Sequence, residues 1–598
     1  MKKTILLILI LTTTKSISQI YLSPSAYMYV KGEVLFVQQD VNLAAGSNLY
    51  LRNNSQLVQG TTGTSTNSGT GTVSVYQEGT TNNYSYNYWC SPVGDPSAIG
   101  NGSFGITMLS RPTTSTLSTA ATILTATNSD GTASPLAIAQ KWIYKLINAT
   151  SYSQWVFVGG TTTLAPGQGF SMKGTSGTDA TDPEGTGVTN NPGSAQRYDF
   201  RGKPNDGDIT VSLLANNTTL TGNPYPSALD LNAFLLDASN TASGGTAYFW
   251  EQDKTVNSHT LINYRGGYEA YSPVSRNSPG IYTPATFSSY NGDGTVNNGG
   301  SNSTLIINRR YSPIGQGFVL NASANGFATF RNSHRVFVKE APGDSQFERN
   351  ASKENNTKKE QSNQEAVEEL SYLRLNTIIN NQFTRQLALA FVSTATDGVD
   401  YGIDALNMDD DLPNDVTFRI EDGSYVIQGI NYDETKKIAL TVKVATATTF
   451  KFFIPEVINF DPNQKIYIYD ALDDSYHDIK NGTYLVTVAP GVYNDRFKIT
   501  FRDETILGVE NNTIKQFFIS QDNINKNLKA SNPNNFALKS FKLYDVLGKT
   551  VLSKKDLGTD ENYTFSTTGL SSGIYISEFL TTDNQRFTEK IVISNSGK

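Results

Sequence analysis

Short runs of alternating apolar and polar residues, separated by glycine, asparagine and threonine, extend along almost the whole chain. Residues 34–37, 48–51 and 72–76 are examples near the N-terminus. Because the side chains of a strand alternate between two faces, this pattern predicts short β-strands and an all-β fold. Between residues 20 and 83 the runs recur at the spacing of a β-solenoid, in which each rung is a strand and a turn. A simple β-meander fits the same residues.

Two segments in the middle of the chain carry the same landmarks in the same order. Each has an early aromatic or proline-rich motif, then aromatic strands, and then the unit Gly-Gln-Gly-Phe, at 167–170 and again at 315–318. Chance would rarely preserve this order, so we predict two copies of one β-sandwich-like unit, at 84–210 and 211–344. In each copy we expect the glycines to form a tight turn and the phenylalanine to be buried.

A polar stretch follows the second copy. Residues 350–364 contain no aromatic and almost no apolar side chain, so burial cannot offset the entropy of ordering them. We therefore predict a disordered linker over 345–369. Strand-like runs separated by turn residues return between 370 and 503, which predicts a further β-sandwich domain.

Composition supports this picture and limits the partners. The chain has 598 residues, more than one hydrophobic core usually supports, so several domains are expected. Charged residues make up only 17% while tyrosine numbers 31, a balance that favours strands over helices. The formal net charge is −7, and no block of Lys or Arg is long enough to follow a phosphate backbone. Nucleic acid is therefore not expected as a partner.

The N-terminus has the pattern of a signal peptide. Lys2 and Lys3 precede the apolar run 5–11, and the polar stretch ending at Gln19 offers a small-residue cleavage site. We predict a signal peptide over 1–19. The apolar run is too short to cross a bilayer, so no transmembrane anchor is expected. Cys90 is the sole cysteine, so we expect no internal disulfide and a buried thiol.

The last part of the chain resembles a known family. Residues 541–549 (Phe-Lys-Leu-Tyr-Asp-Val-Leu-Gly-Lys), 569–576 (Gly-Leu-Ser-Ser-Gly-Ile-Tyr-Ile) and 590–593 (Lys-Ile-Val-Ile) are similar to motifs of the type A sorting domain of the type IX secretion system. The Tyr-Pro-Asn-Pro signature of that family is absent. The residues of 504–598 that carry the resemblance are Tyr544, Asp545, Gly548, Lys549, Gly573, Tyr575 and Lys590.

This resemblance implies a small antiparallel Ig-like β-sandwich and a route of export. The protein would pass from the periplasm across the outer membrane of a Gram-negative bacterium, with the type IX secretion machinery and its surface sortase as partners. It would then be either released or attached to the cell surface.

Candidate catalytic residues are sparse. His259, His334 and His477 are the three histidines, and none stands at the spacing of a zinc site. No Gly-x-Ser-x-Gly motif accompanies the abundant serines. Glycoside cleavage would require a pair of carboxylates, and the candidates for that pair are Glu251 and Glu269. We therefore expect no enzymatic activity and no catalytic residue.

Two binding sites are conceivable instead. Trp89, Trp155 and Trp250 lie in the duplicated region and could stack against sugars, although tryptophan is more often a core residue. A second candidate is a structural Ca²⁺ site, because hard oxygen ligands crowd one loop region. Its candidate ligands are Asp397, Asp400, Asp404 and Asp409. A solvated acidic hairpin explains the same aspartates without an ion.

The sequence as a whole predicts an exported, non-catalytic, multidomain surface or extracellular protein that is adhesive or contacts glycans. A polysaccharide-active enzyme and a purely structural surface component are the alternatives. The expected domains are 1–19, 20–83, 84–210, 211–344, 345–369, 370–503 and 504–598.

Overall fold

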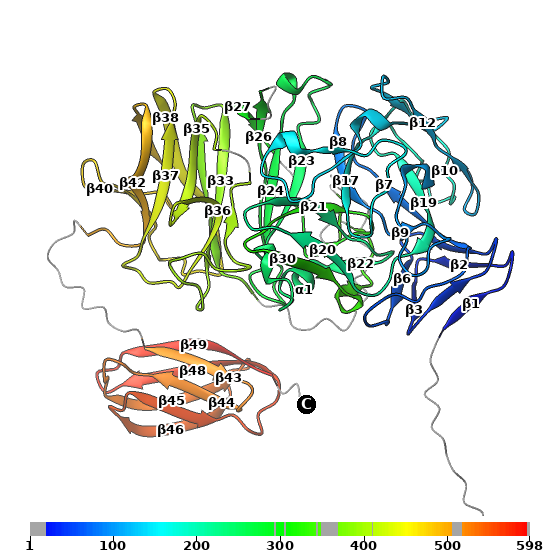
Figure 1. Cartoon of the computed structure of the whole chain (residues 1–598). Helices are drawn as coiled ribbons and strands as arrows, with labels where there is room; N and C mark the ends of the chain where they lie inside the picture. Colours follow the sequence, from blue (N-terminus) through cyan, green and yellow to red (C-terminus); the bar gives the residue numbers. More distant parts are fainter. Residues whose placement is uncertain are drawn as a thin grey trace, which may run out of the picture. The chain divides into compact units, whose positions relative to one another are not determined.

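The computed structural model of the chain is all-β, as the sequence predicts (Figure 1). In the described residues the strands are joined by turns, 3-10 helices and one short α-helix, α1 (Leu231–Leu235). The chain divides into two compact units, Met1–Asp503 and Glu504–Lys598. The predicted cleavage region and most of the predicted linker lie outside the described residues. Those residues are 19–291, 295–303, 307–341, 345–347, 369–408, 411–504 and 517–594.

The first strands stack in parallel as rungs. β1, β2 and β3 pair in parallel with β4, β5 and β6, so that Tyr27 faces Asn48 and Val34 faces Gln56. Buried Val41 and Leu49 lie in the core that these rungs enclose. This stacking is that of a β-solenoid and not of the meander that the sequence left open. The strands are β1 (Ile20–Leu22), β2 (Tyr27–Lys31), β3 (Val34–Val37), β4 (Val41–Leu43), β5 (Asn48–Arg52) and β6 (Gln56–Gln59).

The strand β7 (Thr72–Glu78) joins the solenoid to the first half of the duplicated region. It pairs in parallel with β5 on one side and antiparallel with β19 (Arg197–Pro204) on the other. The resulting sheet runs β11-β10-β19-β7-β5-β2, with β9 paired to β19. The solenoid and the first half therefore share one sheet. The added strands are β9 (Val93–Gly94), β10 (Leu109–Pro112) and β11 (Ser118–Ala120).

The two halves of the duplicated region have the same strand order. The first contains the sheet β8-β17-β15-β16, and the second begins β21-β29-β23-β24. Their registers correspond: Cys90 faces Gly169 as Gly222 faces Gly317, so both Gly-Gln-Gly-Phe units enter equivalent strands. The strands are β8 (Tyr86–Cys90), β15 (Tyr144–Lys145), β16 (Val156–Phe157), β17 (Gly169–Lys173), β21 (Thr218–Gly222), β23 (Ala247–Gln252), β24 (Gly266–Ser272) and β29 (Gly317–Asn321).

A second pair of strands repeats in each half. β7 pairs antiparallel with β19 in the first, and β20 (Ile209–Leu213) pairs antiparallel with β30 (Gly326–Phe330) in the second. The remaining strands of the two halves are short or lie at the sheet edges. They are β12 (Thr122–Leu124), β13 (Gly131–Thr132), β14 (Ala137–Ala139), β18 (Thr175–Ser176), β22 (Ala228–Asp230), β25 (Ile281–Thr283), β26 (Thr286–Tyr290), β27 (Val296–Asn302), β28 (Tyr311–Ser312) and β31 (Arg335–Val336).

The two halves contact each other through equivalent glycines. A side chain on Gly169 would meet Leu220 Cγ and the Thr221 carbonyl oxygen at 2.7 Å, and one on Gly317 would meet backbone atoms of β8 at 2.6 Å. Each half thus places its second motif glycine against the first sheet strand of the other half. The first motif glycines, Gly167 (φ +81°) and Gly315 (φ +77°), adopt the left-handed conformation that the expected turn requires.

The two motif phenylalanines fill separate cores. Phe170 is fully buried against Phe104 in the core shared with the solenoid. Phe318 is fully buried near Phe234 and Phe330 in the core of the second half. Each half therefore has its own packing centre, although their backbones touch.

Residues 370–503 form one curled sheet. The sequence predicts two facing sheets here, but the strands join in the order β40-β39-β42-β37-β35-β36-β33-β32-β38-β41, with β34 on β36. Register shifts next to Arg374 and Leu440 bend the strands. The sheet closes until Tyr484 of β41 stacks on His477 of β40, with ring centroids 3.6 Å apart.

The strands of this curled sheet are β32 (Tyr372–Ile379), β33 (Phe383–Phe391), β34 (Ala405–Leu406), β35 (Asn414–Ile420), β36 (Gly423–Ile430), β37 (Lys437–Val444), β38 (Thr448–Ile458), β39 (Tyr467–Asp470), β40 (Ser475–Asp478), β41 (Tyr484–Val488) and β42 (Gly491–Thr500). β33 also lies against β25, β26 and β27 of the second half. The curled sheet is therefore part of the first compact unit and does not stand apart from the duplicated region.

The second unit has two small antiparallel sheets, β43-β44-β47 and β46-β45-β48-β49. Phe541, Phe565 and Phe579 are buried in its core. This is the small sandwich that the sorting-domain resemblance implies. Its strands are β43 (Phe518–Asp522), β44 (Asn527–Ser531), β45 (Leu538–Asp545), β46 (Thr550–Gly558), β47 (Asn562–Ser566), β48 (Gly573–Thr581) and β49 (Arg586–Ile593).

Candidate functional site

The most distinctive group of side chains lies on one face of the sheet β16-β15-β17-β8. Phe157 faces Tyr144 across the strands, and Tyr144 faces Ser171. Because side chains alternate along β17, Phe170 enters the core while Ser171 and Lys173 point to the opposite face. Tyr86 faces Lys173 on the neighbouring strand β8. This face therefore presents aromatic rings around one lysine.

The lysine is held against three rings. Its Nζ lies 3.9 Å from the centroid of the Trp142 ring, 4.8 Å from that of Tyr86 and 5.4 Å from that of Tyr264. Lys173 is only 5% exposed. Tyr264 belongs to the second half of the duplicated region, so the site lies where the two halves meet. We call Lys173 and these three rings the lysine cage.

His259 completes the arrangement. Its Nδ1 lies 3.2 Å from Lys173 Nζ, and its Nε2 lies 2.9 Å from Asp130 Oδ1. The imidazole stacks on Trp142 at an interplanar angle of 15°. An ionised carboxylate can only accept a hydrogen bond, so Nε2 carries the proton and Nδ1 accepts from the amine.

Burial dominates the electrostatics of the cage. It lowers the pKa of Lys173 from its ordinary value of 10.5 to about 7, because removing the ammonium from water disfavours the charged form. The negative charge of Asp130 acts in the opposite direction, and nearby Lys141 adds to the lowering. Burial raises the pKa of Asp130, but hydrogen bonds from Asn83 and His259 outweigh it and hold that pKa below its usual range.

Further rings extend the cage toward solvent. The ring centroids of Tyr144 and Phe157 are 5.4 Å apart. Burial raises the pKa of Tyr86, and the nearby hydroxyl groups of Tyr152 and Tyr144 raise it further. Tyr152 is 51% and Phe157 44% exposed. We call the set that continues outward from Trp142 the aromatic row. Its members are Tyr86, Trp142, Tyr144, Tyr152 and Phe157.

The predicted tryptophan platform is not an exposed surface. Trp89 is 1% exposed and packs against Tyr198 and Phe200 in the core. Trp250 is 9% exposed and stacks against Tyr88 and other tyrosines. Trp155 is half-buried beside Tyr88. The exposed rings in this region are Tyr152 and Phe157, which lie close to Trp155 in the sequence. The sequence alone does not distinguish these two residues from the many other aromatic residues.

The two glutamates considered for catalysis share one buried face. Glu269 is fully buried and forms an ion pair with Arg309, whose guanidinium lies 4.1 Å from the Phe249 ring centroid. Glu251, on the neighbouring strand, is 6% exposed. Both carboxyl groups are therefore largely shielded from solvent.

The aspartates considered for Ca²⁺ have protein partners, and the Asp404 carboxylate accepts a hydrogen bond from the backbone N–H of Asp400 at 2.6 Å. Asp397 pairs with Lys436, while Asp400 accepts hydrogen bonds from Thr396. Asp404 accepts from the backbone of Gly429 at 2.7 Å, and its burial raises its pKa to about 7. Asp409 lies outside the described residues. In the part of the chain that the structure describes, no three metal-ligating side chains come together in one group.

The remaining candidates have local partners. His334 accepts from the Arg331 backbone and contacts Asp237 at 2.9 Å, and burial lowers its pKa. His477 lies 2.7 Å from the Ser475 hydroxyl. Cys90 is a buried free thiol whose pKa burial raises, so it is not an activated nucleophile.

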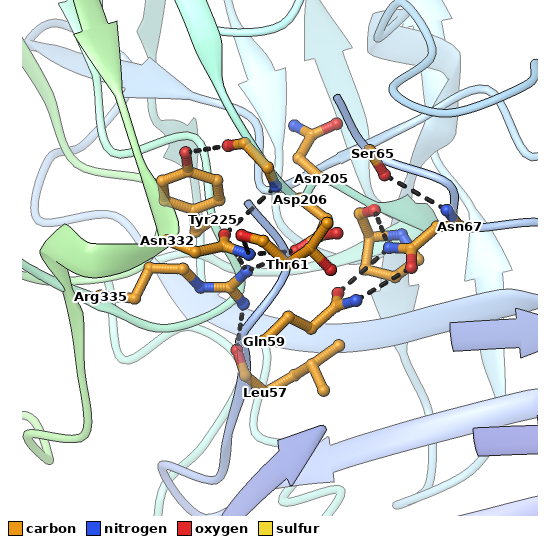
Figure 2. A network of polar contacts seen from close by, with 12 residues as sticks. Leu57, Gln59, Thr61, Ser65, Asn67, Asn205, Asp206, Tyr225, Asn332 and Arg335 are labelled. Atoms are coloured by element: carbon orange, nitrogen blue, oxygen red, sulfur yellow. Dashed lines mark hydrogen bonds and ion pairs between the residues drawn. The ribbon is translucent and has the colours of Figure 1, made fainter. Parts of the chain in front are cut away.

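A buried polar network joins the solenoid to both halves (Figure 2). Arg335 and Asp206 are both fully shielded from solvent in their side chains and form an ion pair of 3.3 Å. Arg335 also donates to the Leu57 carbonyl of the solenoid and to Asn332. Burial lowers the pKa of Arg335 to about 10. The network thus fastens three segments together through fully shielded charged side chains, and we interpret it as structural.

The sorting-motif residues gather at one end of the tail sheet. Asp545 Oδ1 accepts hydrogen bonds from the backbone of Leu547 and Lys549, and Gly548 has the positive φ that this turn requires. Gly573 lies at the same end, facing Ile593. The buried side chain of Tyr575 donates to the Ser571 carbonyl, Tyr544 donates to Glu578, and Lys590 is exposed.

The solenoid, the duplicated sheets and the sandwich tail define a multidomain β-protein. A family model described as "Domain of unknown function (DUF8693)" matches residues 4–501, and the chain belongs to that family. A second, "Secretion system C-terminal sorting domain", matches residues 520–594. The tail thus directs the protein through type IX secretion to the cell surface or extracellular space. The described residues contain no helix long and apolar enough to cross a membrane.

No curated protein matches the chain. One solved structure, "Biofilm associated protein - BSP domain", is 8% identical over 90% of this chain and 98% of its own, with a TM-score of 0.14. A likeness at that level carries no argument about fold or function.

Proposed function

We propose that this secreted protein is a non-catalytic surface or extracellular protein that contacts glycans through the aromatic row. One observation carries the proposal: Tyr152 and Phe157 lie about half exposed near the partly buried rings of Tyr86 and Tyr144. Soluble proteins rarely leave aromatic side chains grouped in this way unless they meet a ligand or partner.

The chemistry of the row suits sugars. Aromatic faces cover the apolar C–H faces of a pyranose ring, while tyrosine hydroxyls can exchange hydrogen bonds with its hydroxyl groups. Ser151, Ser153 and Gln154 add polar side chains beside Tyr152. A polysaccharide-active enzyme is less well supported, because Glu251 and Glu269 are buried and the latter is paired with Arg309.

A glycan array probed with the full-length secreted protein tests the proposal. We expect binding to a restricted set of extracellular polysaccharides, and loss of at least tenfold in affinity for Tyr152→Ala with Phe157→Ala. Phe327→Ala is the matched control, because Phe327 is 58% exposed on β30 in the second half. Equal binding by the double variant and the wild type would show that the row is not the glycan site.

A further inference from the structure

We infer that Lys173 is a nucleophilic amine that captures small aldehydes as an imine, with His259 as the proton acceptor. This goes beyond glycan contact and does not depend on it. Three segments distant in sequence converge on the site: β17 supplies the amine, while His259 and Asp130 come from loops of opposite halves.

The amine has the surroundings that nucleophilic lysines need. It is shielded from water by the rings of Trp142, Tyr86 and Tyr264, and its hydrogen-bond partner is the His259 imidazole rather than a carboxylate. Desolvation of this kind favours the neutral amine, whose lone pair is the reacting group. The lowered pKa of Lys173 agrees with this geometry.

The His259–Asp130 pair supplies the proton transfer. Asp130 fixes the proton on Nε2, so Nδ1 offers a lone pair 3.2 Å from Lys173 Nζ. The neutral amine attacks the aldehyde carbon, the carbonyl electron pair moves to oxygen, and that oxygen takes a proton from water and leaves hydroxide. Nδ1 accepts the proton lost from nitrogen. Returning that proton from Nδ1 to the hydroxyl group expels water and leaves a protonated C=N bond, whose N–H proton passes to the hydroxide. One amine and one aldehyde thus give one imine and one water, and no oxidant is needed.

The burial of the site restricts the ligand. Lys173 is 5% exposed, whereas the side chain of His259 beside it is 23% and that of Asp130 52% exposed. We therefore expect the amine to be reached from the His259 side by a small aldehyde or by the end of a longer one, such as an open-chain reducing sugar. A branched ketone would not fit.

Reductive alkylation of the full-length protein with propanal and cyanoborohydride at pH 7.5, followed by peptide mass spectrometry, tests the inference. We expect N-propylation at Lys173 roughly tenfold faster than at Lys141. The reason is that a much larger fraction of Lys173 than of an ordinary lysine is deprotonated, and therefore reactive, at this pH. Lys141 is the matched control because its amine also lies near the Trp142 ring but contacts Ser129 instead of His259. Labelling of Lys173 slower than that of Lys141 would overturn the inference.

Two further measurements separate reactivity from simple access. The labelling rate of Lys173 should level off above about pH 7, while the rates of exposed lysines continue to rise. His259→Gln should slow the labelling of Lys173 several-fold and leave the other lysines unchanged, and Asp130→Asn should have a smaller effect in the same direction. A rate at Lys173 that rises in parallel with the exposed lysines, or is insensitive to His259→Gln, contradicts the assignment.

Discussion

Replacing Lys173 with methionine should stabilise the protein at low pH and have little effect at high pH. Methionine keeps the length and apolar contacts of the side chain but carries no charge. The pKa of Lys173 is about 7 in the folded protein and 10.5 in the unfolded chain. Between pH 7 and pH 10.5 this lysine is therefore protonated in the unfolded state and largely deprotonated in the folded state. Stability of the wild type therefore rises as pH increases from about 7 to about 10.

The magnitude follows from the same shift. A pKa difference of this size lowers the free energy of unfolding by about 5 kcal/mol at most. The full loss applies below pH 7, where Lys173 is charged in both the folded and the unfolded state. The cation–π contacts with Trp142 and Tyr86 favour the charged form and reduce this value. We expect Lys173→Met to raise the free energy of unfolding by about 2–5 kcal/mol at pH 6, with the gain disappearing toward pH 10.

Urea unfolding of the full-length protein, followed by tryptophan fluorescence at pH 6, 7, 8.5 and 10, measures this. All four tryptophans lie between residues 89 and 250, so the signal reports on the duplicated region and not on the tail. Lys141→Met is the control and should change stability by less than about 0.5 kcal/mol. Equal destabilisation by Lys173→Met at pH 6 and pH 10 would refute the reasoning, because the ring contacts would then outweigh the cost of burial.

Three other perturbations test the architecture. Phe170→Ala and Phe318→Ala should each cost about 3–5 kcal/mol in urea unfolding, because both side chains are fully buried, whereas exposed Phe327→Ala should be nearly neutral. Arg335→Met should cost about 3–5 kcal/mol by leaving Asp206 buried without its ion-pair partner, and adding Asp206→Asn should restore part of the loss. Deleting residues 504–598 should leave the protein in the periplasm on fractionation and immunoblotting, and undiminished export would contradict the role of the tail.

The repetitive parts of the fold could be predicted because each repeat carries its own local signal. The strands of the solenoid follow from their short apolar runs, but each coil contains three strands and not the single strand and turn that the sequence predicts, so Tyr27 pairs with Asn48 three strands later. The equivalence of the two Gly-Gln-Gly-Phe strands follows from the order of short motifs. Turn and close-approach glycines are visible in a sequence because only glycine tolerates those positions.

The candidate site could not be predicted in this way. Lys173, His259 and Asp130 stand in unremarkable contexts and meet only through the packing of the two halves. Solitary histidines are rarely catalytic, so His259 offered no signal. The exposed end of the aromatic row was missed for a related reason: composition shows how many rings a chain has, but exposure depends on which face of which strand each occupies. Trp89 and Trp250 lie in cores, while Tyr152 and Phe157 do not.

The reciprocal glycine contacts have a consequence for how the molecule can be divided. Gly169 of the first half approaches β21 of the second as Gly317 approaches β8 of the first, which is the geometry of an isologous interface in a homodimer. Only residues 205–208 connect β19 to β20, so the two halves resemble a dimer whose subunits have been fused into one chain. Either half produced alone would expose the patch that its counterpart covers, and it should then associate with a second copy of itself.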